Sequence, residues 1–332
     1  MGRIKRAVSL YSFQDRYVKG IMQLEDMFAY LKENNCGMEI LTDQMVPGAP
    51  RPTEETYAWW DNLMNKYQVT PVINDIFVNI NLFKGREVSP KEGASMLIDE
   101  LRMSKRLGFP MVRLLSLTPV SIIERALDEA EKLNITITAE IHGSMSFDNP
   151  NSANFIRLMR ESKSSRLGLV IDTGIFCRKF PRAVRMYHST LGTNEAVCQF
   201  VDDVYDRGED ILSLIKKNGG QAPDDLKKLY TGPYDSEYID LACTFENAPI
   251  NILDEYLPHV CHFHGKVYEM TENGQEYSIS YPELIDYLKA HNYDGYIATE
   301  YEGNRYTLPG HPVIEMEQVN AHQNLLRQLL GE

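Results

Sequence analysis

The stretch ITITAEIHG, residues 135–143, is an apolar, β-branched run that ends in an acid and a histidine. Three later runs likewise end in an acid or a histidine, residue types that can bind a divalent metal: LGLVIDTG (167–174), HVCHFHGK (259–266) and GYIATEYEG (295–303). Runs of this length and composition are typical of buried β-strands. Because strands that pack side by side bring their ends together, we expect the polar residues that end these runs to form one site.

Four earlier stretches also predict strands: AVSLYSF (7–13), GMEIL (37–41), VTPVI (69–73) and MVRLLS (111–116). Helical patterns separate the strands. Apolar residues recur at helical spacing from Leu24 to Leu31, and Ser89 followed by Pro90 and Glu92 predicts an N-cap with a capping box. Gly108 is expected to stop that helix.

Strand and helix units repeat about every 30 residues, and the strands are too apolar to face water on either side. Eight such units predict a (β/α)8 TIM barrel that spans residues 1–332 as a single domain. The interval after the sixth strand is longer than one helix needs and includes VDDVYDRGED and KNGGQAPDD. We expect residues 177–256 to be an insertion on the face where such barrels keep their active sites.

Composition excludes several classes of protein. The formal net charge of -13 argues against the basic surface of a nucleic-acid binder and against an anionic membrane as partner. No signal-peptide pattern and no stretch that could span a bilayer is found, so we expect a cytoplasmic protein. The five cysteines form no CxxC pair, which predicts reduced thiols rather than disulfides or a structural zinc site.

The residues at the four later strand ends can bind a divalent cation: Glu140, His142, Asp172, His262, His264 and Glu300. A barrel interior normally holds apolar side chains, so charged groups there need a ligand or each other. A set of salt bridges and a metal site both remain open. Carboxylates with imidazole suit Mn²⁺, with Mg²⁺, Co²⁺ and Zn²⁺ as alternatives. We expect a metal enzyme in which the ion polarises a substrate carbonyl.

Side chains alternate along a strand, which puts Glu140 and His142 on one face, and His262, His264 and Lys266 on another. The sequence alone does not decide which of the two later histidines would bind an ion. His142 would lie beside the ion, where an imidazole suits a general base, although it could instead orient Glu140.

Lys266 is expected either to stabilise a developing enolate charge or to pair with Glu300 or Glu302. Several further residues lie at or after strand candidates and could hold sugar hydroxyls: Tyr11, Gln14, Asn74, Asp75 and Arg113. We expect the substrate to contact Arg113, His262, Tyr11 and Glu302.

The chain resembles the xylose isomerase-like TIM barrels, the sugar isomerase and epimerase superfamily, whose strand ends supply Glu, Asp, His and Glu to a divalent metal. The matching positions are Glu140, Asp172, His264 and Glu300. Within this superfamily, three stretches resemble the catalytic α subunits of bacterial C-glycoside deglycosidases: IKRAVSLYSFQ (4–14), EIHG (140–143) and HFHGKVYEM (262–270).

The resemblance implies a lyase-type β-elimination on a 3-oxo-C-glycoside, with His142 taking the C2 proton and the aglycone leaving from C1. It also implies a hetero-oligomer with a small β subunit. Ketose 3-epimerases carry a DxxH motif on the strand with the Asp ligand, but here Ile175 stands three residues after Asp172. Three alternatives remain: a sugar or sugar-phosphate isomerase or epimerase, an endonuclease IV-like enzyme, and a non-catalytic sugar-binding barrel.

Overall fold

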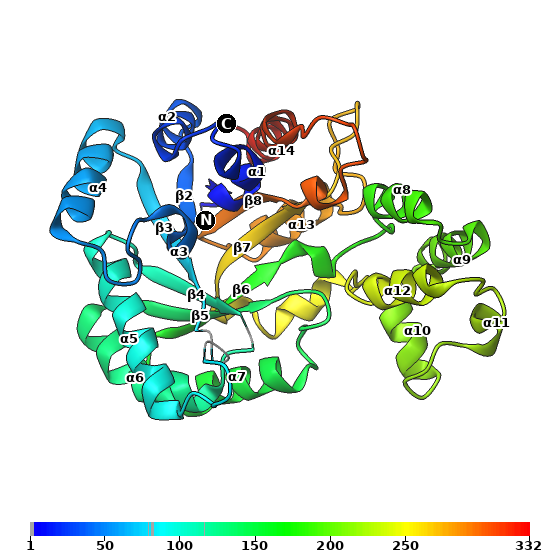
Figure 1. Cartoon of the computed structure of the whole chain (residues 1–332), viewed down its shortest axis with the longest axis horizontal. Coiled ribbons are helices and arrows are strands. Elements are labelled where there is room, and N and C mark those ends of the chain that lie inside the picture. Colours follow the sequence, from blue (N-terminus) through cyan, green and yellow to red (C-terminus); the bar gives the residue numbers. More distant parts are fainter. Residues whose placement is uncertain (1–2, 79, 81–82, 116) are drawn as a thin grey trace.

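The computed structural model describes residues 3–78, 80, 83–115 and 117–332. Eight parallel strands close into a barrel in chain order, as predicted (Figure 1). The strands are β1 (Lys5–Ser9), β2 (Gly37–Leu41), β3 (Thr70–Ile76), β4 (Met111–Leu115), β5 (Thr136–Ile141), β6 (Leu167–Asp172), β7 (Val260–Val267) and β8 (Tyr296–Tyr301). Since β1 pairs with β8, the barrel leaves no open sheet edge.

Helices alternate with the strands and cover the outside of the barrel. They are α1 (Gln14–Val18), α2 (Leu24–Asn34), α3 (Thr42–Met45), α4 (Glu54–Tyr67), α5 (Pro90–Arg106), α6 (Val120–Leu133), α7 (Pro150–Glu161), α13 (Tyr281–Ala290) and α14 (Glu315–Leu330). Their apolar faces and the outward faces of the strands form the main hydrophobic core. The predicted (β/α)8 fold is therefore confirmed.

The long segment between β6 and β7 forms the group of helices that extends away from the barrel on the right of Figure 1. Its helices are α8 (Arg182–Leu191), α9 (Glu195–Asp206), α10 (Ile211–Lys217), α11 (Asp224–Lys227) and α12 (Pro233–Ala242). Short 3-10 turns flank the strands: η1 (Leu10–Phe13), η2 (Thr173–Ile175), η3 (Ile250–Asp254), η4 (Leu257–His259) and η5 (Gly303–Tyr306).

The first strand ends earlier than the sequence suggests. We predicted a strand to Phe13, but β1 ends at Ser9 and the next four residues form η1. The hydroxyl of Ser12 donates to the Thr299 carbonyl and accepts from the Tyr301 N–H. These side-chain hydrogen bonds to β8 take the place of backbone hydrogen bonds between strands. The backbone of residues 10–13 can therefore adopt the 3-10 turn instead of extending β1.

The helix α5 begins and stops as its signals predict, with one exception. The Ser89 hydroxyl accepts a hydrogen bond from the Glu92 N–H, and Gly108 follows the helix with φ +94°. The reciprocal half of the predicted capping box does not form. The Glu92 carboxylate instead pairs with the Arg86 guanidinium at 2.8 Å, because this ion pair competes for its oxygens.

The interior of the barrel is divided into two layers. A small apolar cluster fills the lower part with Ala7, Val72, Ile73, Val170 and Ala298. Three of these residues precede an acid on the same strand face by two positions, and the acids are Asp75, Asp172 and Glu300. The apolar layer therefore supports a charged layer at the C-terminal ends of the strands.

All five cysteines are free thiols, as predicted, and three of them are buried. Among the residues that the structure describes, no helix has the length and apolar character needed to cross a membrane.

Candidate active site

A cavity of about 410 Å³ opens at the C-terminal ends of the strands. Eight of the residues that the sequence singled out line it: Tyr11, Arg113, Glu140, His142, Asp172, Lys266, Glu300 and Glu302. They come from most of the strands around the barrel. Because the strands are parallel and the barrel is closed, residues far apart in the sequence meet at one end of it. The position at the C-terminal face is the one where barrels of this architecture carry out chemistry.

Four ligand-type side chains converge at this cavity, three of them lining it: Glu140, Asp172, His264 and Glu300. One ligand atom from each lies within 4.8 Å of the others, and all four side chains are buried. Strand register explains the convergence, because Asp172 is paired with His264 across β6 and β7. The Nδ1 atom of His264 lies 2.7 Å from Oε1 of Glu140 and 3.3 Å from Oε2 of Glu300.

The donor set fits a divalent cation. Five carboxylates are buried in the charged layer: Glu39, Asp75, Glu140, Asp172 and Glu300. They face two permanent cations, Arg113 and Lys266. The excess of negative charge needs protons or a bound cation, since uncompensated buried charge is costly. Three carboxylates with one imidazole form a set suited to Mn²⁺ and related ions.

The pKa values of the ligands reflect this crowding. Burial alone raises the pKa of Glu140, but Arg113 and His264 outweigh it and lower that pKa to about 2. Burial likewise opposes ionisation of Glu300, but the positive charges of Lys266 and His264 outweigh it. The pKa of Glu300 therefore falls well below its usual range. Asp172 differs, because burial raises its pKa to about 6 despite Lys266. Two of the carboxylates are therefore held ionised within the layer.

Lys266 forms the positive wall of the site. Its Nζ atom lies 3.0 Å from Asp172, 2.7 Å from Glu300 and 3.1 Å from Glu302. Burial favours the neutral amine, but these carboxylates outweigh it and raise the pKa of Lys266 well above its usual value. The side chain stays an ammonium, so it can stabilise negative charge and cannot serve as a base. It contacts both of the partners suggested by the sequence, and Asp172 in addition.

Arg113 spans two carboxylates at the side of the cavity. Its Nε atom lies 3.0 Å from Asp75, and its Nη1 atom lies 3.6 Å from Glu140. Asp75 is itself fully buried, so it serves as the counter-ion of Arg113 and does not line the cavity. The guanidinium thereby fixes the orientation of one ligand of the cluster.

His142 lies just beyond the end of β5 and lines the same cavity as Glu140, two residues earlier. It belongs to a turn in which it bridges to Met145, and its half-buried side chain lines the cavity. Glu140 is held by His264 and Arg113. His142 therefore faces the space where a substrate would lie.

The turn that carries His142 is pressed against the segment before β7. A Cβ atom on Gly143 would lie 1.6 Å from the Thr244 carbonyl oxygen, so only glycine fits there. The next residue, Ser144, has φ +63° and donates its N–H to Glu246. The stretch that follows α12 is thus packed onto the turn that carries His142.

Polar residues at the rim can bind hydroxyl groups. Arg305 donates to the Tyr11 hydroxyl at 2.9 Å and pairs with Glu302 at 3.1 Å. All three line the cavity. Two other candidates are not brought to it, because Asn74 donates to Ser104 on α5 and Gln14 donates to Gln44.

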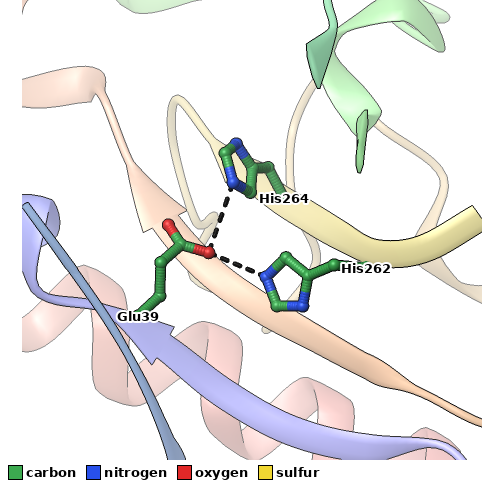
Figure 2. Close-up of side chains that lie close together, drawn as sticks. All are labelled: Glu39, His262 and His264. Atoms are coloured by element: carbon green, nitrogen blue, oxygen red, sulfur yellow. Dashed lines mark hydrogen bonds and ion pairs between the residues drawn. The ribbon is translucent and has the colours of Figure 1, made fainter. Parts of the chain in front are cut away.

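Sequence reasoning missed Glu39 and placed His262 differently. The structure buries His262 below the cavity, where its Nε2 atom lies 2.7 Å from Oε2 of Glu39 (Figure 2). His262 therefore does not reach the position expected for a substrate contact. Glu39 is the single acid in the apolar strand sequence GMEIL. Because a buried carboxylate without partners is costly, this acid could have been recognised as part of a polar cluster.

The fold is that of the xylose isomerase-like sugar isomerases and epimerases. A sugar phosphate isomerase/epimerase from Parabacteroides distasonis superposes with a TM-score of 0.55 at 9% identity, over 98% of this chain and 94% of that one. A D-psicose 3-epimerase gives 0.54 at 11% identity over 99% and 100%. The IOLI protein, solved with a zinc atom, gives 0.55 at 9% identity over 98% of each.

The sequence is similar to α subunits of C-glycoside deglycosidases, which confirms the resemblance inferred from its motifs. A 3'-dehydrocarminate deglycosidase α subunit from a Microbacterium species is 25% identical over 98% of this chain and 95% of its own. A C-glycoside deglycosidase α subunit from Arthrobacter globiformis is 22% identical over 99% and 93%. One from Microbacterium trichothecenolyticum is 23% identical over 91% and 84%. No protein-family model matches the chain.

Proposed function

We propose that this protein is a divalent-metal-dependent deglycosidase that releases the aglycone of a 3-oxo-C-glycoside by β-elimination. The observation that carries the proposal is the buried four-ligand cluster at a cavity that also contains His142 and Lys266. The similarity to deglycosidase α subunits over nearly the whole chain supports a deglycosidase activity. One of those relatives is named for a 3'-dehydro substrate, which supports a sugar that is already a ketone.

The metal, with Mn²⁺ as the expected ion, would be held by Glu140, Asp172, His264 and Glu300. When bound, such a cation supplies Lewis-acid polarisation of the 3-oxo group and so acidifies the neighbouring C2–H bond. Arg113 keeps the Glu140 carboxylate oriented during this process.

His142 takes the proton from C2 in this proposal. The imidazole lines the cavity and comes from a turn that is braced by the neighbouring segment, so its position is fixed before substrate binds. A general base of this kind contributes roughly 10²- to 10⁴-fold to the rate.

Lys266 stabilises the enolate that forms as the proton leaves. The electron pair then moves to form the C1–C2 double bond, and the bond from C1 to the aglycone breaks. The aglycone departs with that electron pair and gains a proton from the imidazolium of His142 or from water. Tyr11 and Glu302 lie at the rim, where they would bind sugar hydroxyls.

The relatives are named α subunits, so we propose that this chain also works with a partner subunit. We further propose a single catalytic domain over residues 1–332, in which residues 177–256 are an insertion that shapes one wall of the site. Leu241 and Phe245 from this segment line the cavity.

The proposal is tested by substituting His142→Ala in the Mn²⁺-loaded protein with its partner subunit. The matched control is His291→Ala, which removes an exposed histidine outside the cavity. Aglycone release from a 3-oxo-C-glucoside should fall by roughly 10²- to 10⁴-fold in the first variant. It should be unchanged in the second, and both should bind metal as the parent does.

Unchanged aglycone release in His142→Ala would remove this residue from the mechanism. No release by the parent protein, together with conversion of a free sugar to its epimer or ketose, would assign isomerase or epimerase chemistry to the site instead.

A further inference from the structure

A second buried group lies on the inner side of the metal-type cluster and consists of Glu39, His262 and His264. Figure 2 shows both imidazole rings directed at one oxygen of the Glu39 carboxylate. Oε2 of Glu39 is 2.7 Å from Nε2 of His262 and 3.2 Å from Nε2 of His264. All three side chains have no exposed surface, so a substrate cannot reach them.

His264 belongs to both groups and presents a different nitrogen to each. Its Nδ1 atom faces Glu140 and Glu300, at 2.7 Å and 3.3 Å. Its Nε2 atom faces Glu39 on the opposite side, at an ion-pair distance of 3.2 Å and without a formed hydrogen bond among the described residues. A neutral imidazole has one N–H and one lone pair, and only the nitrogen with the lone pair can bind a cation. The proton of a metal-binding His264 must therefore lie on Nε2, toward Glu39.

The Glu39 carboxylate favours this arrangement because an ionised carboxylate only accepts hydrogen bonds. His262 supplies a second donor to the same oxygen. Its Nδ1 atom has no hydrogen-bond partner among the residues that the structure describes. A nitrogen with a lone pair tolerates this more readily than an N–H does, so the proton of His262 also belongs on Nε2.

A second metal ion between Glu39, His262 and His264 is the competing interpretation. It would require the Nε2 lone pair of His264 while Nδ1 binds the first ion, so that this ring would carry no proton and would bind as an imidazolate. The negative charge of Glu39, 3.2 Å from Nε2, favours a proton on that nitrogen instead.

We propose that Glu39 is a positioning residue that, with His262, holds His264 in the tautomer whose lone pair on Nδ1 faces Glu140 and Glu300. This inference rests on the proposed metal-dependent function. Outer carboxylates that orient a metal-binding histidine are a general feature of metal sites, and their loss weakens metal affinity by about 10- to 100-fold.

The first test measures metal affinity by competition with a chelating indicator for the parent and for Glu39→Gln. The matched control is Glu315→Gln, which also neutralises a fully buried carboxylate, but one that pairs with Arg16. We expect the Mn²⁺ dissociation constant to rise by about 10- to 100-fold in Glu39→Gln. We expect the control to bind as the parent does. Equal affinity in Glu39→Gln and the parent would overturn the inference.

The second test does not use Glu39→Gln and remains decisive if that variant fails to fold. Nitrogen-15 NMR of the histidine-labelled, Zn²⁺-loaded parent reports which ring nitrogen of His264 carries the proton, with His264→Gln used to assign its signals. We expect the proton on Nε2 and the metal on Nδ1. The reverse pattern would overturn the inference and leave the proposed function intact, whereas a parent that binds no metal would overturn the proposed metal dependence itself.

Discussion

The backbone N–H of Ser144 donates a 3.0 Å hydrogen bond to Oε1 of Glu246. This bond joins the turn after β5 to the segment that precedes β7, about a hundred residues later in the chain. His142 lies in that turn, so the stretch after α12 contacts the turn that carries the proposed base. We therefore expect this stretch to help fix the position of His142.

Gly143→Ala should reduce turnover strongly. The new Cβ atom would lie 1.6 Å from the Thr244 carbonyl oxygen, so the turn and the adjoining segment must separate. A displacement of about 1 Å can cost roughly 10²-fold in rate. Aglycone release and metal content of the variant should be measured together, and we expect turnover to fall while metal remains bound.

Its control is Gly232→Ala in the same long segment, where no heavy atom lies within 4 Å of the added Cβ and φ is -159°. This variant should retain parental turnover. Full turnover in Gly143→Ala would mean that the position of His142 does not depend on this contact.

Glu246→Gln should change how stability depends on pH. Burial raises the pKa of Glu246 to about 7. Because the folded state holds this proton more tightly than the unfolded state, the parent loses unfolding free energy as pH rises from the ordinary glutamate pKa toward about 7. The amide of glutamine does not titrate and can still accept from Ser144.

Chemical denaturation at about pH 5 and about pH 8 checks this expectation. The unfolding free energy of the variant relative to the parent should rise between the two by on the order of 1–3 kcal/mol. Glu237→Gln, an exposed glutamate on α12, serves as control and should track the parent. An equal pH dependence in parent and Glu246→Gln would show that Glu246 is ionised without penalty.

Lys266→Gln should separate metal binding from turnover. Removing the ammonium leaves Asp172, Glu300 and Glu302 without their shared cation. Loss of one partner of a buried ion pair costs about 3–5 kcal/mol in the metal-free protein. Mn²⁺ should restore much of that stability, while kcat falls by roughly 10²- to 10³-fold because the enolate loses its counter-charge.

Thermal unfolding with and without Mn²⁺, followed by steady-state kinetics, measures both effects. Lys66→Gln is the control, since Lys66 forms an exposed pair with Glu25. Such surface pairs contribute about 0–1 kcal/mol. A parental kcat in Lys266→Gln would exclude the proposed role of the ammonium.

Asp172→Asn should weaken the response to metal. A ligand at 100 times its dissociation constant stabilises a protein by about 2.7 kcal/mol, so EDTA should lower the unfolding temperature of the parent. The variant loses one of the three ligand carboxylates and should respond much less at the same Mn²⁺ concentration. Asp254→Asn, an exposed aspartate, should respond as the parent does. An identical metal response in Asp172→Asn would place the ion elsewhere.

The barrel could be predicted from sequence because its strands are apolar runs and its helices carry local signals. The boundary of β1 could not, since Ser12 forms its decisive bonds with residues about 290 positions away. The full capping box could not be predicted for a different reason. Two local interactions, the cap and the ion pair with Arg86, compete for the Glu92 carboxylate.

Part of the candidate site could also be predicted, since charged residues inside apolar strands need partners. The alternation of side chains along a strand predicts that His262 and His264 share one face. It does not predict the height of each side chain along the barrel axis. Register supplies it: His264 is paired with Asp172 of the charged layer, whereas His262 is paired with Val170 of the apolar layer. Contacts of this kind depend on barrel closure, which no local pattern encodes.

Metal-dependent deglycosidase activity is tested most directly by mass spectrometry of a 3-oxo-C-glucoside incubated in D2O with the Mn²⁺-loaded chain and the proposed partner subunit, beside an EDTA control. We predict metal-dependent release of the free aglycone with an unsaturated 3-oxo sugar as co-product, and no release after EDTA. Deuterium entering an isomeric sugar with no aglycone released would contradict the account and identify isomerase or epimerase chemistry at the same cluster.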